Sequence, residues 1–571
     1  MNTTRPATST VHRALGLLLG NFLGFSIVFC QAPDKEIQSL ADEFFRWRVT
    51  TQPCSPDDIP RVERPKGWVP AVSADALQVM RDRYSDFRQR LDAIERESWT
   101  RSDSVDYLLL RSAIERVHWE LDVLRAPYRD PGFYIQQTLG AIYELLLPQG
   151  AFKERAAEIV LRLQSIPATQ RAGRENLIDP VRPFAANALR TLDGVRVKLT
   201  NMVDGLKPVV PKDLHRALED AARTAADSLE DFAAWLKEGL PDMSDDVSIG
   251  GRAYEYYLHT IALNPMTTEQ MLILGQSEFE RAVVYEGLEQ IRNGRLPEPV
   301  LFKSIEQQIE QEKKDELAIR TFLVDRKLLT IPGWVKHYGN RARPAYVVPL
   351  AEMGVVDDLT SPSRLTDNGV SYIPSPSPSL SYFHRASARD PRPLVLHEGI
   401  PGHYFQLVLS WNNPNPLRRH YFDSGSNEGW GFYVEEMMMQ AGLFDSDRPR
   451  GRETIYNFMR LRALRVAADI KLALGDFSID QAAEYLATMV PMERATAGGE
   501  AAFFASTPGQ AISYQIGKLQ IQKFISDARA VQGKAFDLRM IHDYIVANGN
   551  VPIALLRWEY LGLRDEIEAF W

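Results

Sequence analysis

The sequence predicts a predominantly α-helical protein with a small β element in the middle of the chain. Three observations support this prediction. Apolar residues recur at three- and four-residue steps over long stretches on both sides of the middle. Residues 338–382 are instead rich in proline, serine and glycine and contain short extended pieces. Directly after them, residues 397–406 read H-E-G-I-P-G-H-Y-F-Q and lead into further helical sequence.

Helical periodicity predicts helices, in chain order, over residues 77–94, 105–124, 151–163, 214–240, 271–291 and 553–571. Ser73 is placed to cap the first of these helices. The sequence T-T-E-Q from Thr267 to Gln270 fits a capping box before the fifth. In the β element, the clearest extended piece is Ala345 to Leu350.

The bulk composition limits the class of protein. The chain has 571 residues, which is enough for several hydrophobic cores or for one large helical domain. Hydrophobic residues make up 45% and charged residues 25% of the chain, which is ordinary for a globular protein. The net charge of −9, with no basic block, argues against a general nucleic-acid binder.

The first 32 residues have the layout of a secretory signal peptide. Arg5 and Arg13 make its first part positively charged, residues 14–29 are mainly apolar, and residues 30–32 read C-Q-A, which fits a cleavage site. The apolar stretch is shorter than a typical transmembrane helix. We therefore expect a secreted or periplasmic protein without stable membrane insertion after cleavage, and an uncleaved anchor stays open. A lipoprotein would use Cys30, but Phe29 is too large for the residue before a lipidated cysteine.

Residues His397 to His403 supply two imidazoles and the carboxylate of Glu398. In the common H-E-x-x-H zinc motif, the two histidines lie about 40° apart around an α-helix. Here they are six residues apart, or about 120°, so a regular helix would not direct both rings at one ion. Because Pro401 and Gly402 directly precede His403, we expect the helix to bulge or restart there. The break would return His403 to the face of His397.

Glu428 is the expected third metal ligand, because a catalytic zinc site has three protein ligands and an open position for water. It lies in a second predicted helix that reads N-E-G-W-G-F-Y-V-E-E from Asn427, which is a candidate cap. Glu398 is the expected general base, which takes a proton from the water that zinc activates. The residues thus predict a Zn²⁺ site, with a buried polar network or a decayed site as the alternative.

Two further residues are expected to support the ligands. Glu435 follows Glu428 by seven residues and lies on nearly the same helical face, where it would orient a ligand histidine by a hydrogen bond. A solvated carboxylate is the alternative for Glu435. Gln406, at the end of the first motif, is assigned the same supporting role.

Several other polar residues follow the two motifs or flank them. Tyr514, in the sequence P-G-Q-A-I-S-Y-Q-I-G, is a candidate to hydrogen-bond the oxyanion of a tetrahedral intermediate, with packing as the alternative. Arg465 and Asp469 are four residues apart on a predicted helix and are candidates for an ion pair near the site. Two more histidines flank the first motif and are expected to be structural or surface residues: His384 and His420.

These motifs resemble those of the bacterial domain-of-unknown-function family 885. The resemblance rests on H-E-G-I-P-G-H-Y-F-Q at 397–406, E-G-W-G-F-Y-V-E at 428–435 and P-G-Q-A-I-S-Y-Q-I-G at 508–517. It extends to D-Y-L-L-L at 106–110 and N-G-N-V-P-I-A-L-L at 548–556, and therefore spans most of the chain. The resemblance implies a large helical fold related to the gluzincin metallopeptidases. It also implies metal ligation by His397, His403 and Glu428, with Glu398 as the catalytic acid and base.

Together, the residues and the resemblance predict a secreted zinc-dependent metallopeptidase acting on short peptides. We divide the chain after the signal peptide into an N-terminal helical region (33–330) and a catalytic metal-binding region (331–571), expected to form one continuous fold. Residues 338–382 either bind extended substrate along a strand edge or form a surface loop. Three alternatives to a peptidase stay open: another amide hydrolase, a non-haem iron enzyme with the same ligand set, and a non-catalytic binding protein. The sequence predicts no oligomeric state.

Overall fold

The computed structural model describes residues 34–55, 61–97, 99–150 and 152–570. The predicted signal peptide at residues 1–32 therefore lies outside the described residues. The first part of the chain is helical, with π-helical turns at η1 (Trp119–Val123), η2 (Gln136–Gly140) and η5 (Tyr257–Ile261). Its α-helices are α1 (Lys35–Thr51), α2 (Ala74–Asp92), α3 (Arg101–His118), α4 (Ala126–Arg129), α5 (Pro131–Ile135), α6 (Ala141–Leu146), α7 (Lys153–Asn176), α8 (Arg182–Leu192), α9 (Val195–Leu206), α10 (His215–Gly239), α11 (Gly251–Tyr256), α12 (Thr268–Arg292) and α13 (Ile305–Asp325).

The β element and a second helical part follow. The strands are β1 (Tyr338–Ala342), β2 (Asp357–Asp358) and β3 (Gly369–Ile373). After α14 (Tyr382–Ser387) and α15 (Arg392–Leu394), the π-helical segment η8 (Val395–Gly399) leads into the remaining helices. These are α16 (His403–Trp411), α17 (Pro416–His420), α18 (Ser424–Gln440), α19 (Gly451–Leu474), α20 (Ile479–Met489), α21 (Arg494–Ser506), α22 (Ser513–Gln532), α23 (Leu538–Ala547) and α24 (Ile553–Leu561). The prediction of a predominantly α fold is confirmed.

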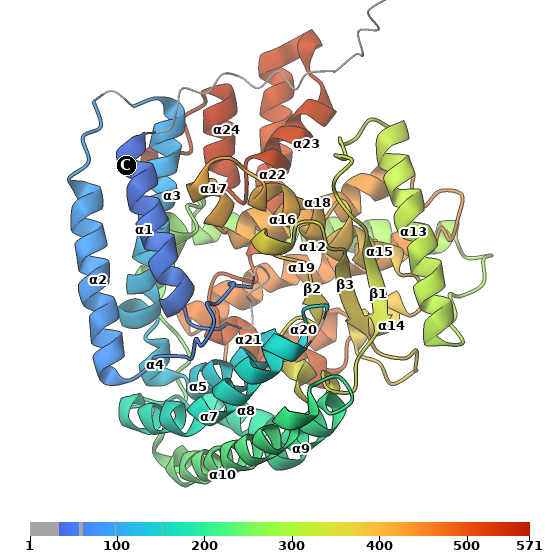
Figure 1. Cartoon of the computed structure of the whole chain (residues 1–571). Coiled ribbons are helices and arrows are strands. Elements are labelled where there is room, and N and C mark those ends of the chain that lie inside the picture. Colours follow the sequence, from blue (N-terminus) through green and yellow to red (C-terminus); the bar gives the residue numbers. More distant parts are fainter. Residues whose placement is uncertain (1–33, 56–60, 98, 151, 571) are drawn as a thin grey trace, which may run out of the picture.

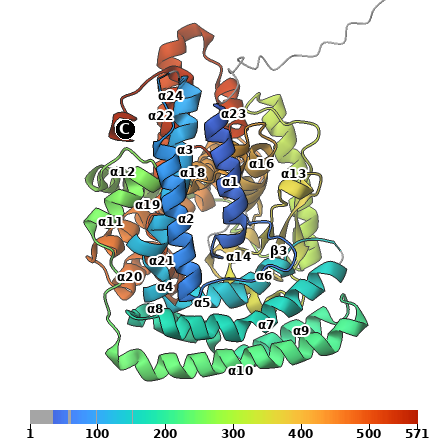
Figure 2. The same cartoon turned by 60° about the vertical axis from the view of Figure 1, so that its left-hand side comes forward.

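The helices enclose a central group formed by α16, α18 and α19. In Figure 1, α1, α2 and α3 stand along one side of this group and α13 stands on the other. After a turn of 60°, α7, α9 and α10 are seen to run across the base (Figure 2). No described helix has the length and apolar composition required to cross a lipid bilayer.

Two of the helix starts predicted from capping residues are confirmed. The Ser73 side chain accepts a hydrogen bond from the backbone N–H of Ala76 and begins α2. Thr267 and Gln270 form a reciprocal capping box at the start of α12. The predicted helix at 105–124 is present as α3 and its π-helical continuation η1. The helix predicted at 151–163 is longer than expected. It is present as α7, which continues past Pro167 to Asn176.

Two local predictions were wrong. The C-terminal helix predicted to reach residue 571 ends at Leu561, because Gly562 adopts the left-handed conformation with φ of 77° and terminates it. The segment Ala345 to Leu350 forms no strand. Pro349 has no backbone N–H to donate to a sheet, and the segment instead turns into the 3₁₀-helix η6 (Val348–Met353).

The predicted β element is present as a small sheet, which lies directly beside the first motif. Its strand order is β1-β3-β2, with β1 parallel and β2 antiparallel to β3. The Tyr338 ring of β1 packs so closely on Gly399 that a Cβ atom at Gly399 would lie 2.5 Å from the ring. The sheet therefore contacts the backbone of η8 at the residue that follows Glu398.

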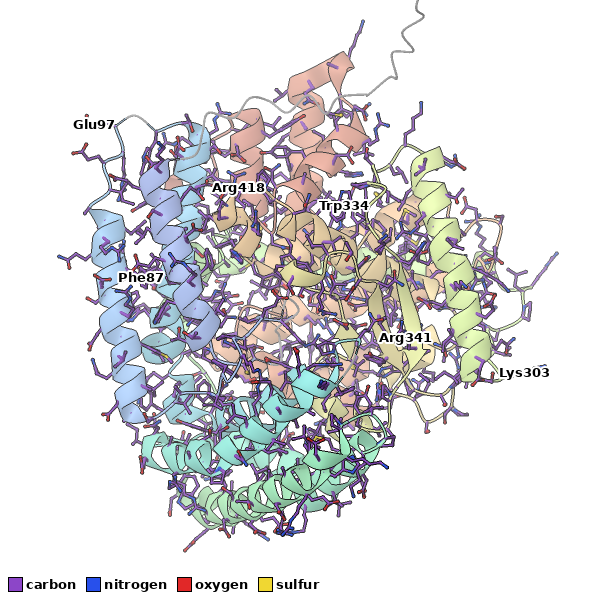
Figure 3. The ribbon with its side chains drawn as sticks, viewed as in Figure 1. Phe87, Glu97, Lys303, Trp334, Arg341 and Arg418 are labelled. Atoms are coloured by element: carbon purple, nitrogen blue, oxygen red, sulfur yellow. The ribbon has the colours of Figure 1, made fainter. Side chains whose placement is uncertain are left out.

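The principal hydrophobic core contains residues of both predicted regions. Phe87 of α2, which is labelled in Figure 3, packs against Phe44 of α1 with ring centroids 5.3 Å apart. The same core includes residues of α16, α18 and α24. Arg418 of α17 reinforces this connection through ion pairs with Asp106 of α3 at 2.8 Å and Glu559 of α24 at 2.7 Å. The N-terminal helices thus support the elements that carry the motifs.

Candidate metal centre

The chain breaks between His397 and His403, at the position predicted from proline and glycine. The π-helical segment η8 ends at Gly399, Ile400 is extended, the Ile400–Pro401 peptide is cis, and α16 begins at His403. Only glycine fits at 402, because a Cβ atom there would lie 1.8 Å from the carbonyl oxygen of His397. The break brings the two imidazole rings to a centroid distance of 4.6 Å.

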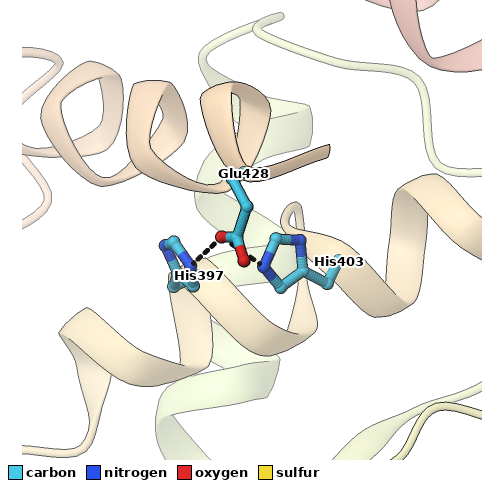
Figure 4. Close-up of side chains that lie close together, drawn as sticks. All are labelled: His397, His403 and Glu428. Carbon is cyan, nitrogen blue, oxygen red and sulfur yellow. Dashed lines mark hydrogen bonds and ion pairs between the residues drawn. The ribbon is translucent and has the colours of Figure 1, made fainter. Parts of the chain in front are cut away.

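Glu428 of α18 reaches between the two imidazoles (Figure 4). Its Oε2 atom lies 3.2 Å from His397 Nε2 and 3.1 Å from His403 Nε2. All three side chains are buried. A Cβ atom at Gly431 would lie 3.0 Å from the Cε1 atoms of both histidines. The glycine one turn after Glu428 therefore lets both rings pack directly against α18.

The three donor atoms have the arrangement of a metal-binding site. Ligands about 2.0–2.1 Å from one zinc ion in tetrahedral geometry are separated from each other by about 3.4 Å. The separations between Glu428 and the two imidazoles are close to this value, and all three donors lie within 4.8 Å of one another. Within the described part of the chain, this is the one group of three or more histidine, cysteine or acidic residues with such an arrangement. The residues therefore fit the predicted Zn²⁺.

The electrostatic environment also favours a cation between these residues. Burial alone lowers the pKa of His397, but hydrogen bonding to Glu428 and Glu435 outweighs burial and raises that pKa to about 10. Burial raises the pKa of Glu428, but the charges and hydrogen bonds of His403 and His397 outweigh it and hold the pKa below its usual range. In the metal-free protein, a proton on His397 supplies positive charge that a metal ion can replace.

The two predicted supporting residues have different contacts. Glu435 is fully buried, and its Oε1 atom lies 2.7 Å from His397 Nδ1 and 3.1 Å from the Arg462 guanidinium. It is therefore placed to orient the His397 ring. Gln406 instead donates to the carbonyl of Ser426 and accepts from the Asn427 side chain. It holds the first turn of α18 and so acts on Glu428 through the backbone.

Asn427 does not cap the second motif helix. Asp423 does so, because α18 begins at Ser424 and the Asp423 carboxylate accepts a hydrogen bond from the Ser426 backbone N–H. Asn427 lies inside the helix, where its side chain donates to Gln406 and Asn550. The sequence contains Asp423 one residue before α18, and this earlier cap signal was missed.

Glu398 and Tyr514 share a cavity with the three proposed ligands. The cavity has a volume of about 80 Å³. The Tyr514 ring stacks nearly parallel to the His397 ring, with centroids 6.0 Å apart and an interplanar angle of 11°. The cavity is lined by Arg61, Val355, Asp357, Leu359, His397, Glu398, His403, Glu428 and Tyr514. It therefore offers a base and a hydroxyl donor next to the candidate ligands.

Arg465 and Asp469 do not form the predicted ion pair. Arg465 bonds to Glu500 at 2.5 Å, and its guanidinium lies 4.7 Å from the centre of the Tyr514 ring. Asp469 accepts hydrogen bonds from the backbone N–H groups of Gly509 and Ile512. Both residues therefore position the segment that carries Tyr514. Each does so through its own partners and not through the other residue.

Asp357 and Arg61 belong to the cavity although no sequence motif marks them. The Asp357 carboxylate accepts a hydrogen bond from the Tyr338 hydroxyl at 3.0 Å. Its pKa is raised to about 7, first by burial and then by the charge of Glu398. Arg61 donates to the backbone carbonyls of Asp357 and Val355. The Arg61 guanidinium therefore lies against the backbone of β2, in the segment for which substrate pairing and a surface loop were the two alternatives.

The flanking histidines lie outside the candidate centre. His384 hydrogen-bonds to Ser381 at 2.9 Å, and burial lowers its pKa to about 4. Burial also lowers the pKa of His420, whose ring packs against Phe45. Neither histidine lines the cavity around His397 and His403.

The fold and the site together define a predominantly helical protein with a buried cluster of two histidines and one glutamate. The chain belongs to the family described as "Bacterial protein of unknown function (DUF885)", which it matches over residues 61–321 and 341–559. A comparison with curated proteins found no match.

Two solved structures have the same fold. One is described as a "putative lipoprotein of unknown function" from Shewanella oneidensis, with 18% identity and a TM-score of 0.69, and the match covers 91% of this chain and 98% of that one. The other is described as a "putative lipoprotein" from Colwellia psychrerythraea, with 17% identity and a TM-score of 0.73, and the match covers 92% of this chain and 99% of that one.

Proposed function

We propose that this protein is a zinc-dependent hydrolase that cleaves peptide bonds. The observation that supports this function most strongly is the convergence of His397, His403 and Glu428 in a cavity that also holds Glu398 and Tyr514. When bound, zinc supplies a Lewis acid that polarises the scissile carbonyl and lowers the pKa of water to roughly 7.

The side chains of the cavity provide the remaining steps. Glu398 takes a proton from the attacking water and later gives it to the nitrogen of the leaving amine. Tyr514 donates a hydrogen bond to the oxygen that becomes negatively charged in the tetrahedral intermediate. Glu435 keeps the His397 ring in the orientation that directs Nε2 toward the site.

A non-haem iron enzyme is the second candidate, because two histidines and one carboxylate also suit iron. The presence of Glu398 and Asp357 in the same cavity favours hydrolysis. A hydrolase needs a base beside the metal, whereas the iron triad has no such requirement. Another amide hydrolase would use the same residues with a different substrate. An intact set of ligands and base argues against a non-catalytic binding protein.

We also propose that the protein acts outside the cytoplasm, as a secreted or periplasmic enzyme. The predicted signal peptide supports this location. The lipoprotein descriptions given to the two similar structures are compatible with it.

Zinc-dependent cleavage of a peptide library tests the proposed activity. We expect the purified full chain to cleave short peptides after zinc loading, to lose at least about 100-fold of its rate after chelation, and to recover it when zinc is restored. Mass spectrometry of the products gives the cleavage positions. Recovery with ferrous iron and oxygen but not with zinc would favour the iron enzyme. The absence of cleavage in a zinc-loaded sample would contradict a peptidase.

A further inference from the structure

A second and much larger cavity lies beside the candidate metal centre. Its volume is about 580 Å³, which is in the range of small-molecule binding pockets. Ser424 lines this cavity one helical turn before Glu428 on α18, about 6 Å away along the axis. Gln510 lines it four residues before Tyr514. The two segments that carry Glu428 and Tyr514 thus also form a wall of the large cavity.

A small third cavity shares lining residues with each of these two cavities. It shares Cys54 and Ser55 with the large cavity and Arg61 and Val355 with the metal-centre cavity. The metal-centre cavity alone, at about 80 Å³, has room for little more than a reacting carbonyl and a water molecule. The rest of a peptide substrate therefore has to occupy neighbouring space, and the large cavity is placed to hold it.

Arg116, in the last turn of α3, lines the large cavity and is only partly exposed. Among the described residues, no hydrogen bond or ion pair engages its guanidinium. Two carboxylates act on it electrostatically, Glu120 and Asp423. Each already has another partner: both oxygens of Glu120 bond to Arg48 at 2.7 and 2.8 Å, and Asp423 accepts from the Ser426 N–H.

An arginine in this situation is suited to bind a carboxylate. Its five N–H donors match the two oxygens of a carboxylate in a fork-like geometry. The guanidinium remains charged at every physiological pH, and a partly buried charge without an ion-pair partner gains when a ligand supplies one. We propose that Arg116 binds a carboxylate of the substrate, so that the protein selects short peptides with a carboxylate held in the large cavity.

This inference rests on the proposed peptide hydrolysis, and binding can test it separately. The zinc-loaded Glu398→Gln variant is titrated calorimetrically with three N-acetylated tetrapeptides: tetra-alanine as the free acid, tetra-alanine as the C-terminal amide, and the C-terminal amide in which glutamate replaces the last alanine. We expect the free acid to bind about 10- to 100-fold more tightly than the alanine amide. If the glutamate amide binds as tightly as the free acid, the cavity accepts a side-chain carboxylate as well as a C-terminal one. If the glutamate amide binds only as weakly as the alanine amide, the recognised carboxylate is the C-terminal one.

The same titrations in an Arg116→Gln background identify the residue. The preference for a carboxylate is expected to fall to about twofold or less, while the affinity for the alanine amide stays the same. The matched control is Arg190→Gln, which removes a charge from an exposed arginine that lines the same cavity and already donates to Asn187. This control is expected to keep the preference. Equal binding of acid and amide, a preference that Arg116→Gln retains, or no binding of any probe would overturn the inference.

Hydrolysis of the same probes by the wild-type protein separates the two proposals. Arg116-dependent binding without cleavage would leave carboxylate recognition intact and contradict the peptidase. Cleavage of acid and amide at equal rates would support the peptidase and contradict the role of Arg116.

Discussion

Replacing Glu398 with glutamine is expected to lower kcat/KM for peptide hydrolysis by about 10²- to 10⁴-fold, the usual contribution of a general acid–base residue. Glutamine has nearly the same shape as glutamate but accepts no proton from water. The zinc content is expected to stay the same, because Glu398 lines the cavity but is not one of the three clustered donors. Steady-state rates and metal analysis of the same samples measure the two effects.

Two comparisons make this result specific. Glu298→Gln removes a carboxylate whose side chain is 81% exposed, and is expected to leave the rate unchanged. Glu398→Asp keeps the carboxylate but shortens the side chain, and is expected to retain part of the activity. An unchanged rate for Glu398→Gln on every peptide cleaved by the wild type would refute Glu398 as the base.

Replacing Gly402 with alanine is expected to impair metal binding without touching a ligand. The new Cβ atom would lie 1.8 Å from the carbonyl oxygen of His397, so the backbone between the two histidines has to move. A displacement of about 1 Å at an active site can cost about 10²-fold in rate. We expect a loss of at least that size in peptide hydrolysis, together with weaker zinc binding and a lower melting temperature.

Gly498→Ala is the matched control for this substitution. Gly498 lies in α21, and a Cβ atom there would meet nothing within 4 Å. The control is expected to keep its zinc, its activity and its melting temperature. If Gly402→Ala behaved in the same way, the close backbone approach at the break would not be required to bring the histidines together.

The sequence was sufficient to predict features that depend on local chemistry. The break at Pro401 and Gly402 follows from the missing N–H of proline and the freedom of glycine, and the capping box at Thr267 follows from side chains three residues apart. The position of Glu435 follows from the helical repeat, since seven residues return it to nearly the same face of α18 as Glu428. In the capping box and at Glu435, the spacing along one helix determines which side chains face each other or share a face.

Features that depend on distant segments were not predictable in the same way. Asp357 reaches the cavity only because β2 pairs with β3, and Arg61 reaches it across nearly 300 residues of sequence. Arg465 was predicted to pair with its neighbour on the helix, but Glu500 of α21 supplies a closer partner. No spacing rule within one helix indicates such partners, because they depend on how the helices pack.

Calorimetric titration of the metal-free protein with zinc, at several pH values and in buffers of different ionisation enthalpy, tests the central claim most directly. We predict one zinc ion per chain and the release of at least one proton near pH 7, because His397 has a pKa of about 10 without metal and binds zinc only as the neutral ring. The affinity should rise with pH below that value, by about tenfold per unit for each proton released. His403→Ala and Glu428→Ala should lose the binding. No stoichiometric binding, or binding that both variants retain, would contradict a metal centre formed by these residues.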